Sequence, residues 1–199
     1  MVDTVPGAEL AIPERSEEQE WIARARAGDA EAFRKLVERH GDHAYGLALR
    51  MLGVASEAEE AAQDAFVRAW RALPHFRGES SFSTWLHRIV VRRALDRQAA
   101  LKTRRAREAP MDEADLAGAA AAAPGDAARR GDLHRKLDRL MGSLSEMQRA
   151  VVLLYYYEDH SVEEVARTLE LPEGSVKTHL HRARAQLRAA WQAEEGENP

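Results

Sequence analysis

The segment SVEEVARTLELPEGSVKTHLHRARAQL, residues 161–187, predicts two short helices joined by a tight turn. Apolar residues recur in its first half at positions i, i+3, i+4 and i+7, on one helix face: Val162, Val165, Ala166 and Leu169. A second apolar stripe with helical spacing lies beyond Pro172: Val176, Leu180, Ala183 and Leu187. Each helix therefore has one face that must pack against other helices, and the segment indicates a helical fold.

The outward side of the second helix carries basic and hydroxyl side chains, which are the candidate base-reading residues: Ser175, Lys177, Thr178, His181 and Arg182. Between Gly174 and Arg188 the chain has four basic residues and no acidic one. A helix-turn-helix motif places its second helix in the major groove of DNA, where side chains contact base edges. We therefore interpret the segment as a DNA-binding helix-turn-helix. The alternative, a helical hairpin with a solvated basic face, is less favoured because acidic partners are absent.

Composition extends the helical prediction to the whole chain. The 199 residues are 45% hydrophobic and 31% charged, and alanine, the strongest helix former, is abundant. No run of alternating β-branched residues is long enough to predict a sheet. The expected fold class is therefore all-α, with two small helical domains. The chain has no cysteine, which excludes a disulfide framework and any thiolate metal site.

Changes of composition divide the chain into five segments. Residues 1–17, rich in Pro, Gly and acidic side chains, predict a disordered N-terminal extension. Residues 18–105 form a first helical block and residues 133–191 a second. Between them, residues 106–132 contain two prolines and an alanine run, which predicts a flexible linker, although the alanine run alternatively forms a further helix. Residues 192–199 are an acidic tail.

Three segments match the capping box. In this motif a Ser side chain caps the start of a helix, and a Glu or Gln three residues later accepts a hydrogen bond from the backbone N–H of that Ser. They are Ser56–Glu59, Ser145–Gln148 and Ser161–Glu164. Each predicts that a helix begins directly after its serine.

Charge is segregated along the chain, although the formal net charge is only −4. From Trp85 to Glu108 there are eight basic residues and two acidic ones. An acidic cluster precedes them in the sequence: Glu57, Glu59, Glu60 and Asp64. This distribution predicts that different faces of the protein meet different partners.

An aromatic segment, FRGESSFSTWL at residues 76–86, combines features of a loop with three large rings. Trp85, Arg88 and Arg92 follow at i, i+3 and i+7, so they share a helix face. Aromatic rings and guanidinium groups stack on unpaired bases, and a base can be extruded from a duplex into such a pocket. The alternative is that Phe76, Phe82 and Trp85 are core residues that hold the loop.

Two stretches resemble a known family. Residues 56–97, SEAEEAAQDAFVRAWRALPHFRGESSFSTWLHRIVVRRALDR, resemble region 2 of bacterial RNA polymerase sigma factors, above all the extracytoplasmic-function (ECF) group. Residues 140–187, from LMGSLSEMQR to the end of the helix-turn-helix, resemble region 4 of the same family. The resemblance extends from Glu18 to Trp191, apart from the linker. Two independent motifs in the family's order make it specific.

The resemblance implies a role for each candidate residue in a protein that binds core RNA polymerase, directs it to promoters and opens the −10 element. The residues implied in −10 binding are Arg77, Ser80, Ser81, Phe82, Trp85, Arg88 and Arg92. Those implied in −35 binding are the five on the second helix, Ser175, Lys177, Thr178, His181 and Arg182. Those implied in polymerase binding are Glu57, Glu60, Gln63, Asp64 and Phe66. The family often has Asn where this chain has Arg92, which bears on −10 specificity.

Further expectations concern partners and chemistry. The resemblance implies promoter DNA, core RNA polymerase and an anti-sigma factor as partners. We expect a cytoplasmic protein without membrane insertion, because the chain lacks a signal peptide and a long apolar run. We expect no enzymatic activity, since no nucleophile elbow or phosphate loop is visible, and no cofactor. The pairs His40/His43 and His179/His181 lack Cys or carboxylates at ligand spacing, so no metal site is expected.

Two other classes of protein are alternatives to a sigma factor. A LuxR-type regulator shares the VKTHL element, but it would need strands and a phosphoacceptor in its N-terminal half. An anti-sigma factor or adaptor would bind through helices without touching DNA, which the unopposed basic charge of residues 174–188 argues against.

Overall fold

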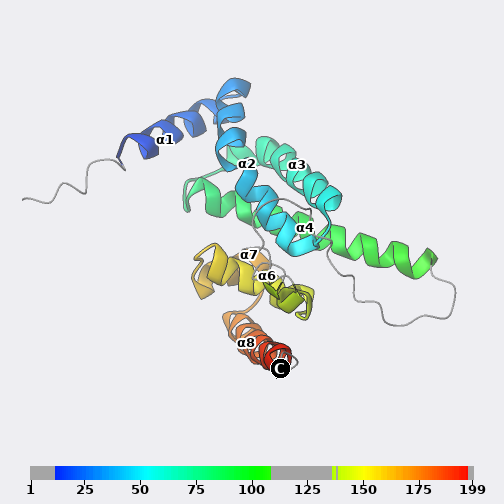
Figure 1. Ribbon diagram of the computed structural model, residues 1–199. Coiled ribbons are helices and arrows are strands. Elements are labelled where there is room, and N and C mark those ends of the chain that lie inside the picture. Colours follow the sequence, from blue (N-terminus) through cyan, green and yellow to red (C-terminus); the bar gives the residue numbers. More distant parts are fainter. Residues whose placement is uncertain (1–11, 109–135, 138, 197–199) are drawn as a thin grey trace, which may run out of the picture.

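The computed structural model describes residues 12–108, 136–137 and 139–196, and every regular element within them is a helix (Figure 1). The N-terminal group comprises α1 (Ile12–Arg26), α2 (Ala30–Leu52), α3 (Ala55–Ala72), the 3-10 turn η1 (Leu73–His75) and α4 (Phe82–Glu108). The C-terminal group comprises helical residues 136–137 and 139–142, α6 (Glu146–Val152), the π-helical turn η2 (Leu153–Tyr157), α7 (Val162–Leu169) and α8 (Glu173–Gly196). The all-α prediction is confirmed. The strands that a LuxR-type regulator would need do not occur in residues 12–108.

Helices α2, α3 and α4 pack around one core in the N-terminal group. Its largest fully buried side chains are Leu36, Leu47, Met51, Leu73, Leu86, Val90 and Val91. Helix α3 contributes mainly alanines to this core: Ala58, Ala61, Ala62, Ala65 and Ala69. Because alanine is small, the neighbouring helices can lie close against α3. The alanine-rich composition thus serves packing as well as helix formation.

Helix α2 has a defined beginning and end. The Oδ1 atom of Asp29 accepts hydrogen bonds from the backbone N–H groups of Glu31 (2.9 Å) and Ala32 (3.1 Å), which is an N-cap. Gly53 ends the helix with a left-handed φ of 72°, and its N–H donates to the Leu49 carbonyl. Helix α1 begins at Ile12, earlier than the Glu18 expected from composition.

The capping boxes at Ser145 and Ser161 are confirmed, with both reciprocal hydrogen bonds present in each. The capping box at Ser56 is wrong: α3 begins at Ala55, two residues earlier than predicted, and its N-cap residue Val54 makes no side-chain cap. The physical reason is the short connection, because Gly53 already ends α2 and leaves only Val54 between the two helices.

The helix-turn-helix has the expected form. Glu170 follows α7 in a left-handed conformation, with φ of 54°, and its N–H donates to the Ala166 carbonyl. Helix α8 begins after Pro172, and its residues Val176, Leu180 and Ala183 are buried. The segment therefore forms two helices around a tight turn, as the sequence predicts.

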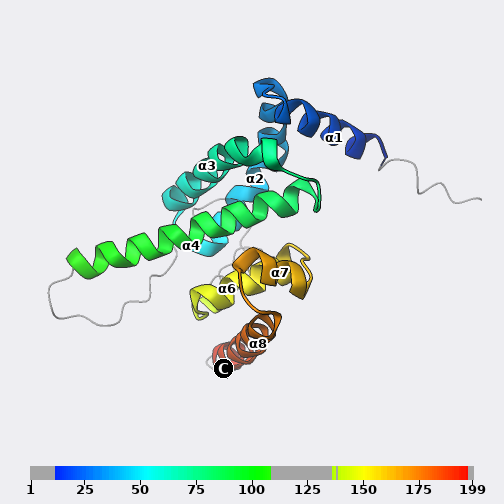
Figure 2. The ribbon, with the colours of Figure 1, turned by 180° about the vertical axis from the view of Figure 1, so that it is seen from behind.

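The two groups of helices contact each other. Figures 1 and 2 show α6 and α7 lying between the N-terminal group and α8. The contacts join α4 to α7 and α2 to α6. Across this interface the Arg149 Nη1 donates to the Met51 carbonyl at 2.9 Å. We call this the closed arrangement.

Three predicted segments fall partly or wholly outside the described residues. Of the expected extension 1–17, only residues from Ile12 onward are described, and they belong to α1. Of the expected linker 106–132, only residues up to Glu108 are described, and they complete α4. The expected acidic tail begins within α8, which continues to Gly196. No helix in the described ranges has both the length and the apolar character to cross a membrane.

Candidate nucleic-acid and polymerase interfaces

The predicted base-reading residues lie on the outward side of α8. Lys177, Thr178, His181 and Arg182 are exposed, and Ser175 is half-buried. The Thr178 hydroxyl donates to the Gly174 carbonyl at 2.8 Å, and Lys177 lies 3.8 Å from Glu173. Because α8 lies on the far side of α6 and α7 from the N-terminal group, these side chains are accessible in the closed arrangement (Figures 1 and 2).

The three rings of the aromatic segment pack on one another. Ring centroids of Phe76 and Trp85 are 5.0 Å apart, and those of Phe82 and Trp85 are 5.6 Å apart. Phe76 is 7% exposed and Phe82 is 3% exposed, whereas Trp85 is half-buried. The structure thus places Phe82 in the core, while stacking on a base needs an exposed ring face. Phe76 and Phe82 are therefore core residues that hold the loop, as the alternative interpretation of the sequence has it.

The polar residues of the loop divide into two kinds. The Ser81 Oγ accepts a hydrogen bond from the Thr84 N–H at 3.0 Å, so it caps the first turn of α4. Ser80 donates to the Ser81 carbonyl at 3.3 Å, and the Arg77 side chain is 82% exposed with Glu79 at 3.8 Å. Arg77 and Ser80 are therefore available to a ligand, whereas the Ser81 hydroxyl already has a structural role.

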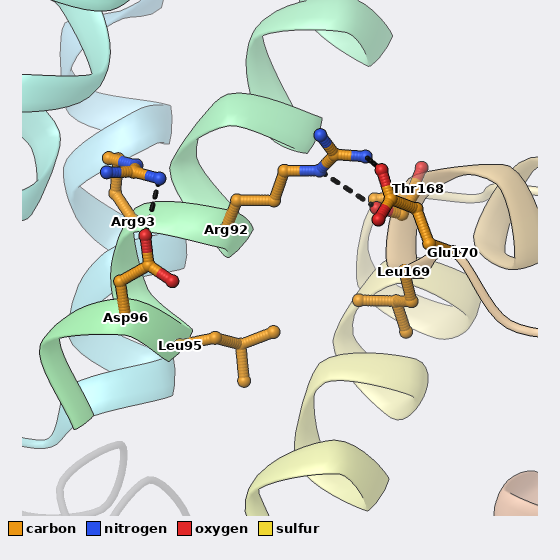
Figure 3. A pocket seen from close by; sticks show the side chains of 7 residues that line it. All are labelled: Arg92, Arg93, Leu95, Asp96, Thr168, Leu169 and Glu170. Atoms are coloured by element: carbon orange, nitrogen blue, oxygen red, sulfur yellow. Dashed lines mark hydrogen bonds and ion pairs between the residues drawn. The ribbon is translucent and has the colours of Figure 1, made fainter. Parts of the chain in front are cut away.

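Arg92 is held by the C-terminal group. Its Nη2 lies 2.5 Å from Oε1 of Glu170, and its Nε donates to the Thr168 carbonyl at 3.4 Å (Figure 3). Beside these contacts is a cavity of about 220 Å³, lined by Arg92, Arg93, Leu95, Asp96, Thr168, Leu169 and Glu170. Arg92, which the sequence predicts to bind the −10 element, is thus already bonded to the helix-turn-helix.

Arg88, one turn before Arg92, has guanidinium atoms that lack hydrogen-bond partners in the described part of the chain. Its Nε and Nη2 atoms are buried and have no hydrogen-bond partner among the described residues. Burial, and next the charge of Arg167, lower the pKa of the Arg88 guanidinium. Buried N–H groups without acceptors cost free energy, so the closed arrangement leaves part of this side chain unsatisfied.

Two acidic side chains of α3 are paired with an arginine of α4. Arg97 makes ion pairs with Glu57 and, at 2.5 Å, with Glu60. Glu57 is only 19% exposed and Glu60 is 59% exposed. Asp64 pairs with Arg68 at 2.9 Å within α3. The predicted acidic cluster therefore has two parts. Glu57 is largely buried and has a structural role, whereas Glu60 and Asp64 are exposed.

The surface also has an apolar hollow of about 300 Å³, to which α3 contributes. It is lined by Ala30, Phe33, Phe66, Val67 and Trp70. Gln63 is exposed and lies on the same side of α3, because residues 63, 66, 67 and 70 recur at i, i+3, i+4 and i+7. Phe66 is 9% exposed and packs edge-on against Phe33. Sequence reasoning missed Val67, which is 48% exposed, although the same helical spacing could have found it.

Comparison with known proteins gives two family matches. The family model of sigma-70 region 2 matches residues 36–106, and that of sigma-70 region 4 matches residues 134–187. The RNA polymerase sigma-H factor of Pseudomonas aeruginosa is 32% identical over 184 residues, which cover 89% of this chain and 95% of that protein. The ECF RNA polymerase sigma factor SigW of Bacillus subtilis is 33% identical over 178 residues, covering 84% and 92%.

Two solved structures are similar in fold. CnrH, in complex with the cytosolic domain of CnrY, matches with a TM-score of 0.62 and 28% identity, over 89% of this chain and 98% of that one. The sigma factor RpoE of Bartonella quintana, in complex with the anti-sigma factor NepR, matches with a TM-score of 0.63 over 80% of this chain and 96% of that one. At 20% identity the second match is evidence for the fold alone.

Proposed function

The chain belongs to the sigma-70 family of RNA polymerase sigma factors, in its ECF group, and we propose that residues 18–105 are its region 2 domain and residues 133–191 its region 4 domain. As a sigma factor it binds core RNA polymerase, directs the enzyme to promoters through −35 and −10 elements, and helps to melt the −10 element. The observation that carries this function is the match of two separate regions in the family's order. The chemistry of transcription stays with the polymerase, so we assign no catalytic residue.

We assign −35 recognition to the outward side of α8, through Ser175, Lys177, Thr178, His181 and Arg182. The exposure of four of these side chains supports the assignment. Arg and Lys can bond guanine edges or phosphates, and Ser, Thr and His can bond base edges. The absence of acidic residues between Gly174 and Arg188 favours approach to the phosphate backbone.

We assign −10 recognition to the loop and the first turns of α4: Arg77, Ser80, Ser81, Phe82, Trp85, Arg88 and Arg92. Within this set, the exposed Arg77 and the half-buried Ser80 and Trp85 are the side chains that could meet an extruded base. The unpartnered guanidinium atoms of Arg88 support a phosphate contact, because phosphate would supply the missing acceptors. Phe82 and Ser81 would act by holding the loop and the start of α4.

Recognition of both promoter elements requires the domains to separate. Elements centred at −35 and −10 are roughly 25 base pairs apart, or about 85 Å at 3.4 Å per base pair. Domains that touch through α4 and α7 cannot reach both. Some 25 linker residues can extend roughly 80 Å, so the chain is long enough for separation. Opening would also release Arg92 from Glu170.

We assign polymerase binding to α3, through Glu57, Glu60, Gln63, Asp64 and Phe66. The exposed Glu60, Gln63 and Asp64 lie on the same helix as Phe66, Val67 and Trp70 of the apolar hollow, and polar groups next to an apolar centre are typical of protein interfaces. Glu57 and Phe66 would support this surface from beneath, because both are largely buried.

We also propose an anti-sigma factor as a partner and a cytoplasmic location. The similar protein CnrH was solved in complex with the cytosolic domain of CnrY. A protein that acts on RNA polymerase works in the compartment that contains it.

In-vitro transcription tests the function directly. The purified chain would be mixed with sigma-free core polymerase and fragmented genomic DNA of the source organism, and transcript 5′ ends would be mapped. We expect discrete start sites that share two upstream elements at fixed spacing. The absence of start sites, together with no co-elution with core polymerase, would refute the proposal.

A further inference from the structure

Three potential metal ligands from distant parts of the chain meet at the interface between the domains. They are His43 on α2, His87 on α4 and Glu158, which directly follows the π-helical turn. The His87 Nδ1 lies 2.7 Å from the Glu158 Oε2, and the His43 Nε2 lies 2.9 Å from the same oxygen. The three ligand atoms all lie within 4.8 Å of one another.

Two imidazole nitrogens and one carboxylate form a ligand set that suits Zn²⁺. Zinc binds His nitrogen at about 2.0–2.1 Å and carboxylate oxygen at about 2.0–2.2 Å in a tetrahedral arrangement. Ligand atoms in such a site are therefore about 3.3 Å apart. Both distances to the Glu158 oxygen are already near this value, so small side-chain movements would admit an ion. Imidazole ligands favour Zn²⁺, Ni²⁺ or Cu²⁺ over Mg²⁺ and Ca²⁺.

The cluster is built into the packing. The Glu158 side chain is 2% exposed and that of His87 is 7% exposed, whereas the His43 side chain is 44% exposed and leaves a route from solvent. The His43 ring is stacked between His87 at 5.0 Å and Tyr157 at 5.5 Å, which fixes its orientation. A carboxylate taken out of water between two imidazole rings gains strongly from a bound cation.

A second observation points to the same place. His160 is 4% exposed, and neither of its ring nitrogens has a hydrogen-bond partner among the described residues. Its ring is stacked on that of His87, with centroids 6.0 Å apart. Asp159, between Glu158 and His160, adopts a left-handed φ of 52°. π-Helical turns are frequent at functional sites, and a buried imidazole without a hydrogen-bond partner calls for an explanation beyond packing.

We propose that His43, His87 and Glu158 bind a divalent transition-metal ion of the Zn²⁺ class, and that this ion holds the two domains in the closed arrangement. Two ligands come from the N-terminal domain and one from the C-terminal domain, so binding requires both domains in contact. An ion that binds only the closed form stabilises it in proportion to its concentration. The consequence for transcription, that the metal withholds Arg88 and Arg92 from promoter DNA, rests on the proposed function.

Co²⁺ titration of the full-length protein, followed by visible absorption, tests the site. We expect one Co²⁺ per chain with a tetrahedral spectrum that Zn²⁺ abolishes. The variants His43→Gln and Glu158→Gln should bind at least about tenfold more weakly. The matched control is His75→Gln, because His75 is exposed and lies outside the cluster. His43 is partly exposed, so its variant should stay folded, which circular dichroism would verify. Absence of one-to-one binding, or equal affinity in all variants, would overturn the site.

Distance measurements test the closure separately. Because the chain has no cysteine, spin labels can be placed at cysteines introduced at the exposed Ala100 and Ala189, one in each domain. Zn²⁺ should narrow the distance distribution toward the closed arrangement in the wild-type background and leave Glu158→Gln unchanged. Metal binding without any change of distance would overturn the closure. Neither experiment involves polymerase or promoter, so their failure leaves the sigma-factor function untouched.

Discussion

The Nη2 of Arg92 lies 2.5 Å from Oε1 of Glu170, so a proposed promoter-melting residue is paired with the turn of the proposed promoter-reading motif. The contact joins side chains 78 residues apart. The contact between the domains therefore competes with the DNA contact proposed for Arg92, because Arg92 cannot bind Glu170 and a DNA phosphate at once.

Glu170→Gln should favour the open form. Both side chains are largely exposed, and such ion pairs contribute little free energy. We therefore expect at most about a fivefold rise in transcription at limiting sigma factor. The matched control is Glu163→Gln, because Glu163 is an exposed carboxylate on α7 that pairs with Arg167. A fall in transcription with Glu170→Gln, relative to this control, would contradict the competition.

Phe82→Ala should act mainly on stability. The ring is 3% exposed and packs against Phe76 and Trp85, so truncation should lower the free energy of unfolding by about 3 kcal/mol or more. Urea unfolding followed by tryptophan fluorescence would measure this change. Arg77→Ala should leave stability within about 0.5 kcal/mol, because the Arg77 side chain is exposed. If Phe82→Ala kept full stability and lost only promoter opening, a direct role in base binding would be preferred.

Asp29 predicts a specific pH dependence of stability. The Ala32 N–H, and next the Arg24 guanidinium at 2.7 Å, hold the pKa of this carboxyl below its usual value. A carboxyl with a lowered folded-state pKa adds stability above its unfolded pKa of about 3.9, and this is lost as pH falls through the folded pKa. Asp29→Asn keeps a good N-cap residue but removes the charge. The difference in melting temperature between wild type and Asp29→Asn should therefore shrink below about pH 4. A difference that is constant with pH would show that the charge of Asp29 contributes nothing.

Arg182→Ala and Lys177→Ala should weaken promoter binding in different ways. If Lys177 contacts phosphate, its loss should lower the slope of log affinity against log salt by about one, equally for all sequences. If Arg182 contacts a base, its loss should cost about 1–3 kcal/mol and relax specificity at one −35 position. Holoenzyme binding to promoters with single −35 substitutions, at several salt concentrations, separates these effects. Gln192→Ala, exposed in the last turns of α8, is the control. An Arg182 variant with unchanged affinity and specificity would remove α8 residue 182 from the interface.

Sequence patterns predicted features that depend on neighbours along the chain. The apolar stripes of residues 162–187 and the capping boxes at Ser145 and Ser161 are confirmed, because helical spacing and local hydrogen bonds determine them. The capping box predicted at Ser56 is wrong, because the short connection through Gly53 determines where α3 begins. The cluster of His43 with Glu158 joins residues 115 apart, which no spacing rule detects. The sequence therefore predicted the helices within each group well, and the contacts between the groups not at all.

Glu57 and Glu60 should have opposite phenotypes, although sequence reasoning gave them one role. Glu57 is 19% exposed and paired with Arg97, so Glu57→Gln should lower the free energy of unfolding by about 1–2 kcal/mol. Glu60 is 59% exposed, so Glu60→Gln should change stability little and weaken association with core polymerase. Urea unfolding and a fluorescence binding assay with core polymerase would measure the two effects in both variants. Because the substitution is the same, each variant is the control for the other. Equal loss of polymerase affinity in both, with no loss of stability in Glu57→Gln, would restore the single acidic surface that the sequence suggested.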